Sequence, residues 1–261
     1  MMSKQRESSL LILLLCGMFA ISSCGGVEPA RQTPAKTNAS QEEKIVTLSP
    51  VKPDTAGETT MPSESIEVPA GEPPTVDGTI ATEEWQNAEV EIFSDGSELL
   101  LLQAGGFLYL GIRANFKGMI AGNVFINQGD EISILHSSAA LGTAIYQRGE
   151  ESWQQKQDFA WRCRDSSNSE SALAERAEFL EAEGWLAANG RMGTPNELEY
   201  KIKIPEQDFR LAVVYIKSSY PYEKVPWPVD LDDDCISPTP GGMPKILAFS
   251  PEAWKGLQLI R

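Results

Sequence analysis

The residues best suited to chemistry lie in one stretch, residues 219–235, which reads SYPYEKVPWPVDLDDDC. Its three aromatic residues, Tyr220, Tyr222 and Trp227, are flanked by prolines, which restrict the backbone and preorganise the chain. Rigid aromatic faces on an exposed loop suit stacking against the C–H surfaces of a sugar ring. Asp232 can accept hydrogen bonds from sugar hydroxyls. The alternative is that Trp227 folds inward as a lid over the core, which is the commoner fate of a tryptophan.

The acids that close this stretch, Asp232, Asp233 and Asp234, offer the oxygen ligands that Ca²⁺ prefers. The run lacks the Asp-x-Asp-x-Asp-Gly spacing and the distal Glu of an EF-hand loop. A calcium site at these three residues is therefore one interpretation. The simpler interpretation is that the acids are solvated and that the protein carries no cofactor.

The single histidine, His136, shares a strand face with Ile134 by alternation. One interpretation makes it a haem ligand, and another makes it the base of a nearby serine. The haem interpretation needs a second ligand opposite, for which the candidates are Met119, Met192 and Met243. Neither a haem motif nor a nucleophile elbow accompanies the histidine. We therefore expect an ordinary hydrogen-bonded strand histidine.

Charge excludes one class of partner. The 261 residues include 37 acidic and 22 basic ones, which gives a net charge of −15. A surface so negative repels phosphate backbones, so we expect no nucleic-acid partner. The chain has no Gly-rich phosphate loop and no Cys/His metal spacing, and no pair of carboxylates stands out as catalytic. The sequence favours a protein that is not an enzyme and leaves a glycosidase of unfamiliar type as the alternative.

The start of the chain predicts export. Residues 9–21 form an apolar run that is too short to span a bilayer and is typical of a secretory signal. Ile21, Ser22, Ser23 and Cys24 follow, and this order resembles the lipobox of bacterial lipoproteins. The resemblance implies that residues 1–23 are removed and that Cys24 is lipidated. The alternative is an ordinary signal with an incidental cysteine.

A linker follows the predicted anchor. Residues 25–70 contain no Phe, Trp or Tyr and six prolines, so they cannot bury enough apolar surface to offset the entropy of ordering them. We expect residues 24–70 to be the lipidated cysteine and a disordered spacer. Residues 71–261 carry all the remaining aromatic residues and form the folded domain.

Alternation of apolar and polar residues dominates the domain and predicts an all-β fold, an antiparallel β-sandwich. The expected strands cover 97–103, 107–115, 121–127, 131–138, 143–148, 197–204 and 210–217, and Gly105-Gly106 predicts a hairpin. In the strand at 197–204 we expect the apolar face to be buried and the face with Glu197 and Glu199 to be wet.

One inserted α-helix interrupts the strands. Ser169 or Ser171 can cap a segment that runs to about Glu183, and Gly184 would end it. Leu173, Ala177 and Leu180 form the apolar stripe that we expect to face the core.

Two cysteines remain in the exported part of the chain after the signal and the lipid site are set aside, Cys163 and Cys235. Outside the cytoplasm two such residues most simply form one disulfide, which we therefore predict.

The entry to the domain resembles that of family-nine carbohydrate-binding modules and their DOMON-like relatives. It has a Pro-x-aliphatic-Asp-Gly stretch that ends in Asp77-Gly78, followed by Trp85. Residues 107–115, 199–205 and 251–260 resemble later strands of that family in the expected order. We expect the entry motif to be structural, with Asp77 bonding backbone amides in a turn and Trp85 plugging one end of the sandwich.

These observations together predict a lipid-anchored, extracytoplasmic lipoprotein of the bacterial cell envelope. Its domain would bind a polysaccharide or oligosaccharide without catalysis. The alternatives are a haem-binding electron-transfer module of the DOMON-like kind and an envelope scaffold that binds another protein.

Replacing Cys24 by Ser removes the thiol to which the lipid would be attached, so we expect the protein to move from the membrane fraction to the soluble fraction. Cell fractionation followed by immunoblotting measures this shift. Cys16→Ser, inside the predicted signal, is the control and should leave the protein in the membrane fraction. Retention of the Cys24 variant in the membrane would contradict the lipid anchor.

Overall fold

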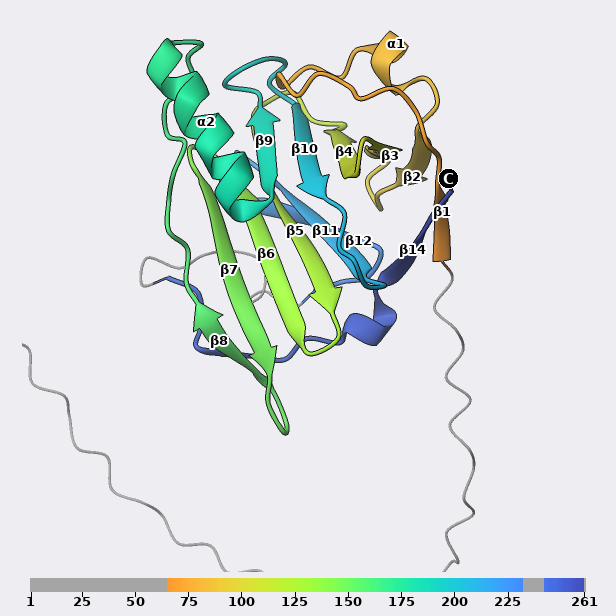
Figure 1. The fold of residues 1–261 in the computed structure, drawn as a ribbon, viewed down its shortest axis with the longest axis vertical. Helices are drawn as coiled ribbons and strands as arrows, with labels where there is room; N and C mark the ends of the chain where they lie inside the picture. Colours follow the sequence, from red (N-terminus) through yellow and green to blue (C-terminus); the bar gives the residue numbers. More distant parts are fainter. Residues whose placement is uncertain (1–64, 232–241, 261) are drawn as a thin grey trace, which may run out of the picture. The chain divides into compact units, whose positions relative to one another are not determined.

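A computed structural model of the protein describes residues 65–231 and 242–260. Their strands form two sheets that pack face to face, and one long helix is inserted between two of the strands (Figure 1). The fold is an all-β sandwich, as predicted.

The larger sheet has nine strands, and its neighbours are antiparallel except for one parallel pair at the edge. In sheet order they are β1 (Ser65–Val68), β14 (Lys255–Leu259), β11 (Arg210–Lys217), β5 (Ile120–Gln128), β6 (Glu131–Ser137), β7 (Leu141–Arg148), β8 (Trp153–Gln157) and β13 (Ile246–Leu247), with β12 (Glu223–Trp227) paired to β11 outside this order.

The smaller sheet has five antiparallel strands. In sheet order they are β2 (Glu89–Ile92), β3 (Glu98–Ala104), β4 (Phe107–Arg113), β10 (Glu197–Lys203) and β9 (Trp185–Asn189). The predicted hairpin joins β3 to β4. Gly105 and Gly106 have φ values of 57° and 82°, a left-handed pair that suits a two-residue hairpin turn.

Strand β1 lies inside the stretch predicted to be a disordered spacer, so the folded domain begins earlier than residue 71. Ile66 and Val68 are buried while the residues that alternate with them are exposed. The strand pairs with β14 near the other end of the chain, and Ala70 bridges to Gln103 in the smaller sheet. The rest of the predicted spacer, the predicted signal and Cys24 lie outside the described residues.

The core between the sheets consists of residues that alternate along the facing strands. It includes Leu99, Leu101, Leu108, Leu110, Val124, Ile126, Leu198, Tyr200, Leu211 and Val213. Burying one such aliphatic side chain contributes about 1.5–3 kcal/mol. This layer holds the two sheets together.

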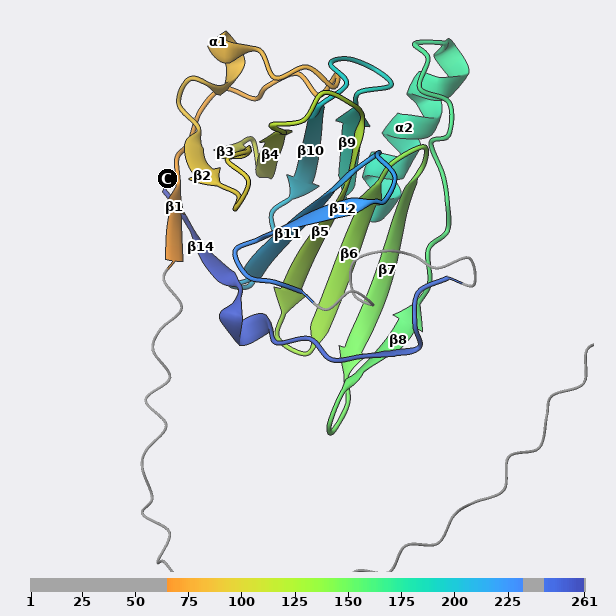
Figure 2. The ribbon, with the colours of Figure 1, turned by 180° about the vertical axis from the view of Figure 1, so that it is seen from behind.

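The outer faces of both sheets are covered as well. The segment around α1 (Thr82–Trp85) lies on the smaller sheet, where Trp85 packs with Leu100, Leu102 and Tyr109. The segment from Met243 through η1 (Pro251–Ala253) lies on the larger sheet (dark blue in Figure 2).

Double coverage explains why the central strands are apolar on both sides. Strands β3 (ELLLLQA) and β11 (RLAVVYIK) are nearly continuous apolar runs, as expected for strands buried on two faces. It also corrects the role of Trp85, which covers the outer face of the smaller sheet and does not plug an end of the sandwich. Gly111 makes room for it, because a Cβ at Gly111 would lie 3.3 Å from the Trp85 ring.

The inserted helix α2 (Glu170–Glu183) has the predicted ends. The Ser169 side chain accepts a hydrogen bond from the backbone of Ala172, and Gly184 ends the helix at a φ of 73°. The predicted core-facing stripe is wrong, since the helix buries a neighbouring one made of Ala172, Arg176 and Phe179. The large ring of Phe179 decides this orientation by packing edge-on against Trp185, with ring centroids 5.1 Å apart.

Gly122 in β5 packs so closely against the inner core that there is no room for a side chain. A Cβ there would lie 2.5 Å from Cδ2 of Leu198 and 2.8 Å from the Tyr200 hydroxyl. We expect Gly122→Ala to lower the free energy of unfolding by about 1–3 kcal/mol, measured by urea denaturation. Gly256→Ala is the matched control, because its Cβ would meet only Ser65 at 3.7 Å and should cost little. Equal stability of the two variants would contradict this packing.

Candidate functional site

The turn between β11 and β12 carries strongly exposed aromatic side chains. Tyr220 is 97% exposed and Tyr222 is 71% exposed. The neighbouring turn before β5 lies beside it, because the Met119 carbonyl accepts a hydrogen bond of 2.9 Å from the backbone of Ser218. The structure thus places two of the predicted site residues together on the surface.

An ion-paired base holds this turn. The Lys217 ammonium lies 2.7 Å from Oε1 of Glu223 and 3.0 Å from Oδ2 of Asp95. Lys217 and Glu223 are partners across the β11–β12 pair, so the contact joins the two ends of the turn. Although burial raises the pKa of Asp95, hydrogen bonds from Tyr215, Ser97 and Lys217 outweigh it and lower that pKa to about 2. The Asp95 carboxylate therefore stays charged beside Lys217 at neutral pH.

Trp227 does not join the two tyrosines. It is 4% exposed, packs in the core between the sheets, and its indole nitrogen lies 3.4 Å from Oε2 of Glu91. Its partner in the β11–β12 register is Val213, which faces the same core. Trp227 is therefore the inward lid, and its expected part in sugar stacking is corrected.

The predicted acidic ligands lie outside the described residues. Asp232, Asp233 and Asp234 all fall in the gap between residues 231 and 242. Among the residues that the structure describes, no group of three His, Cys, Asp or Glu side chains is placed to hold a metal ion. The calcium site and the role of Asp232 stay predictions.

Cys163 is a free, half-buried thiol, so the structure does not contain the predicted disulfide. Cys235 lies outside the described residues. The backbone of Cys163 donates a 2.9 Å hydrogen bond to the Glu175 carboxylate, and burial raises the pKa of the thiol to about 11. Hydrogen bonding to α2, and not a disulfide, holds this segment in the structure.

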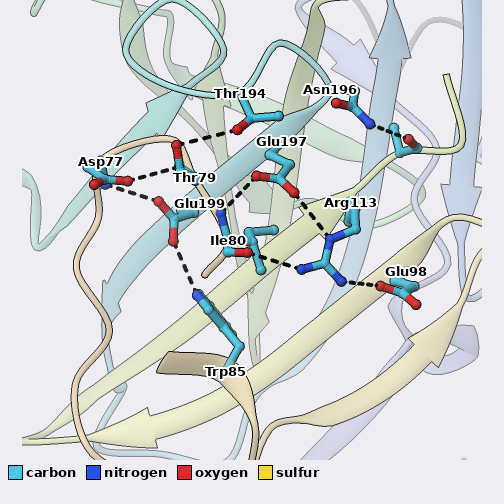
Figure 3. Close-up of polar contacts among 11 residues, drawn as sticks. Asp77, Thr79, Ile80, Trp85, Glu98, Arg113, Thr194, Asn196, Glu197 and Glu199 are labelled. Carbon is cyan, nitrogen blue, oxygen red and sulfur yellow. Dashed lines mark hydrogen bonds and ion pairs between the residues drawn. The ribbon is translucent and has the colours of Figure 1, made fainter. Parts of the chain in front are cut away.

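A buried acidic network ties the entry motif to strand β10 (Figure 3). The Glu199 carboxylate accepts hydrogen bonds from the backbone of Asp77 at 3.0 Å and of Gly78 at 2.8 Å, and from the indole of Trp85 at 3.3 Å. Asp77 in turn accepts a bond from the backbone of Thr79, which confirms its predicted turn role. Two stretches of sequence more than one hundred residues apart are thus joined by one carboxylate.

Glu197 extends the same network. Its carboxylate accepts a 2.8 Å bond from the backbone of Ile80 and a 3.2 Å contact from Arg113 (Figure 3). Arg113 also reaches Glu98 at 2.7 Å and the Ile80 carbonyl at 3.1 Å. Every partner of Glu197 and Glu199 belongs to the covering segment or to the smaller sheet, so the network clamps that segment onto the sheet.

The clamp corrects the expectation that this face of β10 is wet. Glu199 is fully buried and Glu197 is 8% exposed. Burial raises the pKa of Glu199 to about 7, against the lowering effect of the hydrogen bonds from Gly78 and Asp77. The missed signal was the entry motif itself, whose unpaired backbone N–H groups need acceptors.

His136 is a hydrogen-bonded strand histidine, as predicted. Its Nδ1 lies 2.6 Å from the Asn123 side chain and its Nε2 lies 2.9 Å from the Ser138 hydroxyl. Phe159 and Trp161 pack against the ring, with centroids 5.8 Å and 5.2 Å away. Both nitrogens are engaged, so this residue does not fit an axial haem ligand.

A groove runs between α2 and the entry segment and has a volume of about 480 Å³. The sequence did not predict this groove, because Leu173, Ala177 and Leu180, which line it, were expected to face the core. Its lining includes Leu173, Arg176, Ala177 and Leu180 of the helix.

Comparison with protein-family models, curated proteins and solved structures finds no match for this chain. Among the described residues, no helix has both the length and the apolar character needed to cross a membrane.

Glu199 and His136 make opposite contributions to the pH dependence of stability. The pKa of Glu199 is raised from 4.5 to about 7, so its contribution is full below 4.5 and is lost as pH rises through 7. Burial lowers the pKa of His136 from 6.5 to about 4, so its contribution is full above 6.5 and is lost as pH falls toward 4. Between pH 4.5 and 6.5 the contribution of Glu199 to the free energy of unfolding therefore falls with rising pH, whereas that of His136 rises.

We therefore expect His136→Gln to remove the loss of stability that His136 causes as pH falls toward 4. Relative to the unmodified protein, its free energy of unfolding should fall with rising pH across this window, by up to about 1.4 kcal/mol per pH unit. Glu199→Gln should show the opposite difference. Urea denaturation at several pH values measures both, and parallel profiles for all three proteins would contradict the assignment.

Proposed function

We propose that this protein is a lipid-anchored, extracytoplasmic lipoprotein whose sandwich domain binds carbohydrate without catalysis. The observation that carries the proposal is the pair of exposed rings, Tyr220 and Tyr222, on an ion-paired base. Exposed tyrosines offer an apolar face for sugar C–H groups and a hydroxyl for hydrogen bonds. A turn that is already held in place loses little conformational entropy on binding.

The resemblance to family-nine carbohydrate-binding modules and DOMON-like domains gives further support. Two of the stretches that carry it, the Asp77-Gly78 motif and the strand with Glu199, contact one another directly. Their shared role is to hold the fold together. The sugar-contacting residues therefore have to be sought elsewhere, and the turn after β11 is such a place.

The proposed lipid anchor is consistent with carbohydrate binding. A lipidated Cys24 followed by a long polar spacer would hold the domain near the membrane and let it sample nearby polysaccharide. Cys24 and the predicted spacer up to residue 64 lie outside the described residues, and the Cys24→Ser fractionation tests the anchor.

Isothermal titration of the full chain carrying Cys24→Ser against a panel of oligosaccharides tests the binding proposal. Tyr220→Ala and Tyr222→Ala should each weaken binding by about three- to tenfold, which corresponds to the loss of one stacked ring. Ile246→Ala removes another exposed apolar side chain, 63% exposed on β13, and should leave affinity unchanged.

The absence of binding at about 10 mM ligand would overturn the proposal, since such affinities lie below those of specific recognition. Tyrosine variants that bind as well as the unmodified protein would overturn the assigned site. A specific envelope protein that co-purifies while all glycans fail would favour the scaffold function instead.

A further inference from the structure

One apolar stripe of α2 faces a groove and not the core. The helix turns Ala172, Arg176 and Phe179 inward, and Leu173 remains 51% exposed. Leu173, Ala177 and Leu180 then form one wall of the groove beside the helix. The sequence thus provides an apolar stripe that the core does not use.

The other walls come from three separate parts of the chain. They are Val76, Asp77 and Thr79 of the entry segment, Leu186 and Ala187 of β9, and Ser166, Asn168 and Met192 of nearby loops. Most of this lining is apolar. Asp77 is exposed, so solvent and salt screen its charge.

Arg176 brings a buried positive charge to this groove. It is 7% exposed, and its guanidinium donates to the carbonyl of Asp165 at 3.0 Å and to that of Ser167 at 2.7 Å. A guanidinium has five N–H donors, so these two carbonyls leave some of them unused. These carbonyls are neutral, and Arg176 is not ion-paired with the exposed carboxylate of Asp165, whose pKa is lowered by hydrogen bonds from Ser167 and Ser169 and also by the charge of Arg176.

No carboxylate among residues 65–231 and 242–260 lies within ion-pair distance of Arg176. The carboxylate of Asp165, in the same loop, is occupied by the backbone of Ser167 and the hydroxyl of Ser169. Buried charges in proteins are normally paired, and this protein has an excess of acids from which to draw a partner. Arg176 is therefore a buried cation that has no ion-pair partner among residues 65–231 and 242–260.

We propose that the groove binds a small carboxylate with an apolar body. The carboxylate would pair with the guanidinium of Arg176, whose planar fork matches two carboxylate oxygens. The apolar body would lie along Leu173, Ala177 and Leu180. A volume of about 480 Å³ suits a ligand of roughly ten to fifteen heavy atoms. The site is separate from the tyrosine turn and does not depend on carbohydrate binding.

The test compares two probes that differ in charge, 3-phenylpropionate and 3-phenylpropanol, by isothermal titration of the full chain carrying Cys24→Ser. We expect the carboxylate to bind at least tenfold more tightly than the alcohol. Arg176→Gln should abolish that preference while leaving the weak binding of the alcohol. Equal affinity of the two probes, or no binding of either, would overturn the proposal.

A second variant keeps the test independent of the structural role of Arg176. Ala177→Trp fills the groove and leaves the arginine in place, so both probes should lose at least tenfold in affinity. Ala182→Trp is the matched control, because Ala182 is an exposed residue of the same helix outside the groove lining. Equal binding by the two tryptophan variants would overturn the proposed location. Tyr220→Ala should leave carboxylate binding unchanged, which separates this site from the proposed carbohydrate site.

Discussion

The carboxylate of Glu199, buried beneath residues 75–88, is the constraint on which much of the domain depends. A buried carboxylate is costly unless hydrogen bonds replace the water that it loses. Here the backbone of Asp77 and Gly78 and the indole of Trp85 supply those bonds. The same bonds satisfy backbone groups of a segment that has no strand partner of its own. The hydrogen bonds therefore offset part of the cost of burying the carboxylate, and the carboxylate in turn supplies acceptors for the buried N–H groups of the segment.

Once this segment is held in place, the smaller sheet is buried on both faces. Trp85 can lie over Gly111, and Leu100 and Leu102 can be apolar although they point away from the central core. The larger sheet follows the same plan with its C-terminal segment, where Trp254 and Phe249 cover β11 and its neighbours. The sandwich thus has three apolar layers where a simple sandwich would have one. This plan explains how a chain with so many acids can still bury long apolar strands.

Because both outer sheet faces are covered, the few features that the fold leaves available to a ligand stand out. Two tyrosine rings stand out from a turn whose charged base is fully paired. Beside α2, by contrast, the buried guanidinium of Arg176 donates its hydrogen bonds to neutral carbonyls. The buried polar groups of the clamp are matched within the fold, whereas the tyrosine rings are exposed and Arg176 lines a groove with no ion-pair partner among the described residues. They are the places where a ligand would complete an arrangement that the chain leaves incomplete.

The sequence by itself determined the features that depend on neighbours along the chain. Alternation placed β4, β6, β10 and β11 to within a few residues, two glycines predicted the β3–β4 hairpin, and Ser169 and Gly184 predicted the ends of α2. These signals are local, since strand period, turn geometry and helix caps depend on a few adjacent residues.

Only the tertiary structure decided which faces are covered. The sequence predicts that Glu199 is solvated, and only the entry segment that lies over it buries it. For Trp227 the sequence leaves a surface ring and an inward lid as alternatives, and the register with Val213 decides for the inward lid. The helix stripe that buries Phe179 differs from the expected one by a rotation that packing against Trp185 sets. For Glu199 the deciding partner lies more than one hundred residues away, and for Trp227 and Phe179 it lies on the adjoining element of the fold. Local periodicity shows that a face can be buried, and only the packing of whole elements against one another determines that it is.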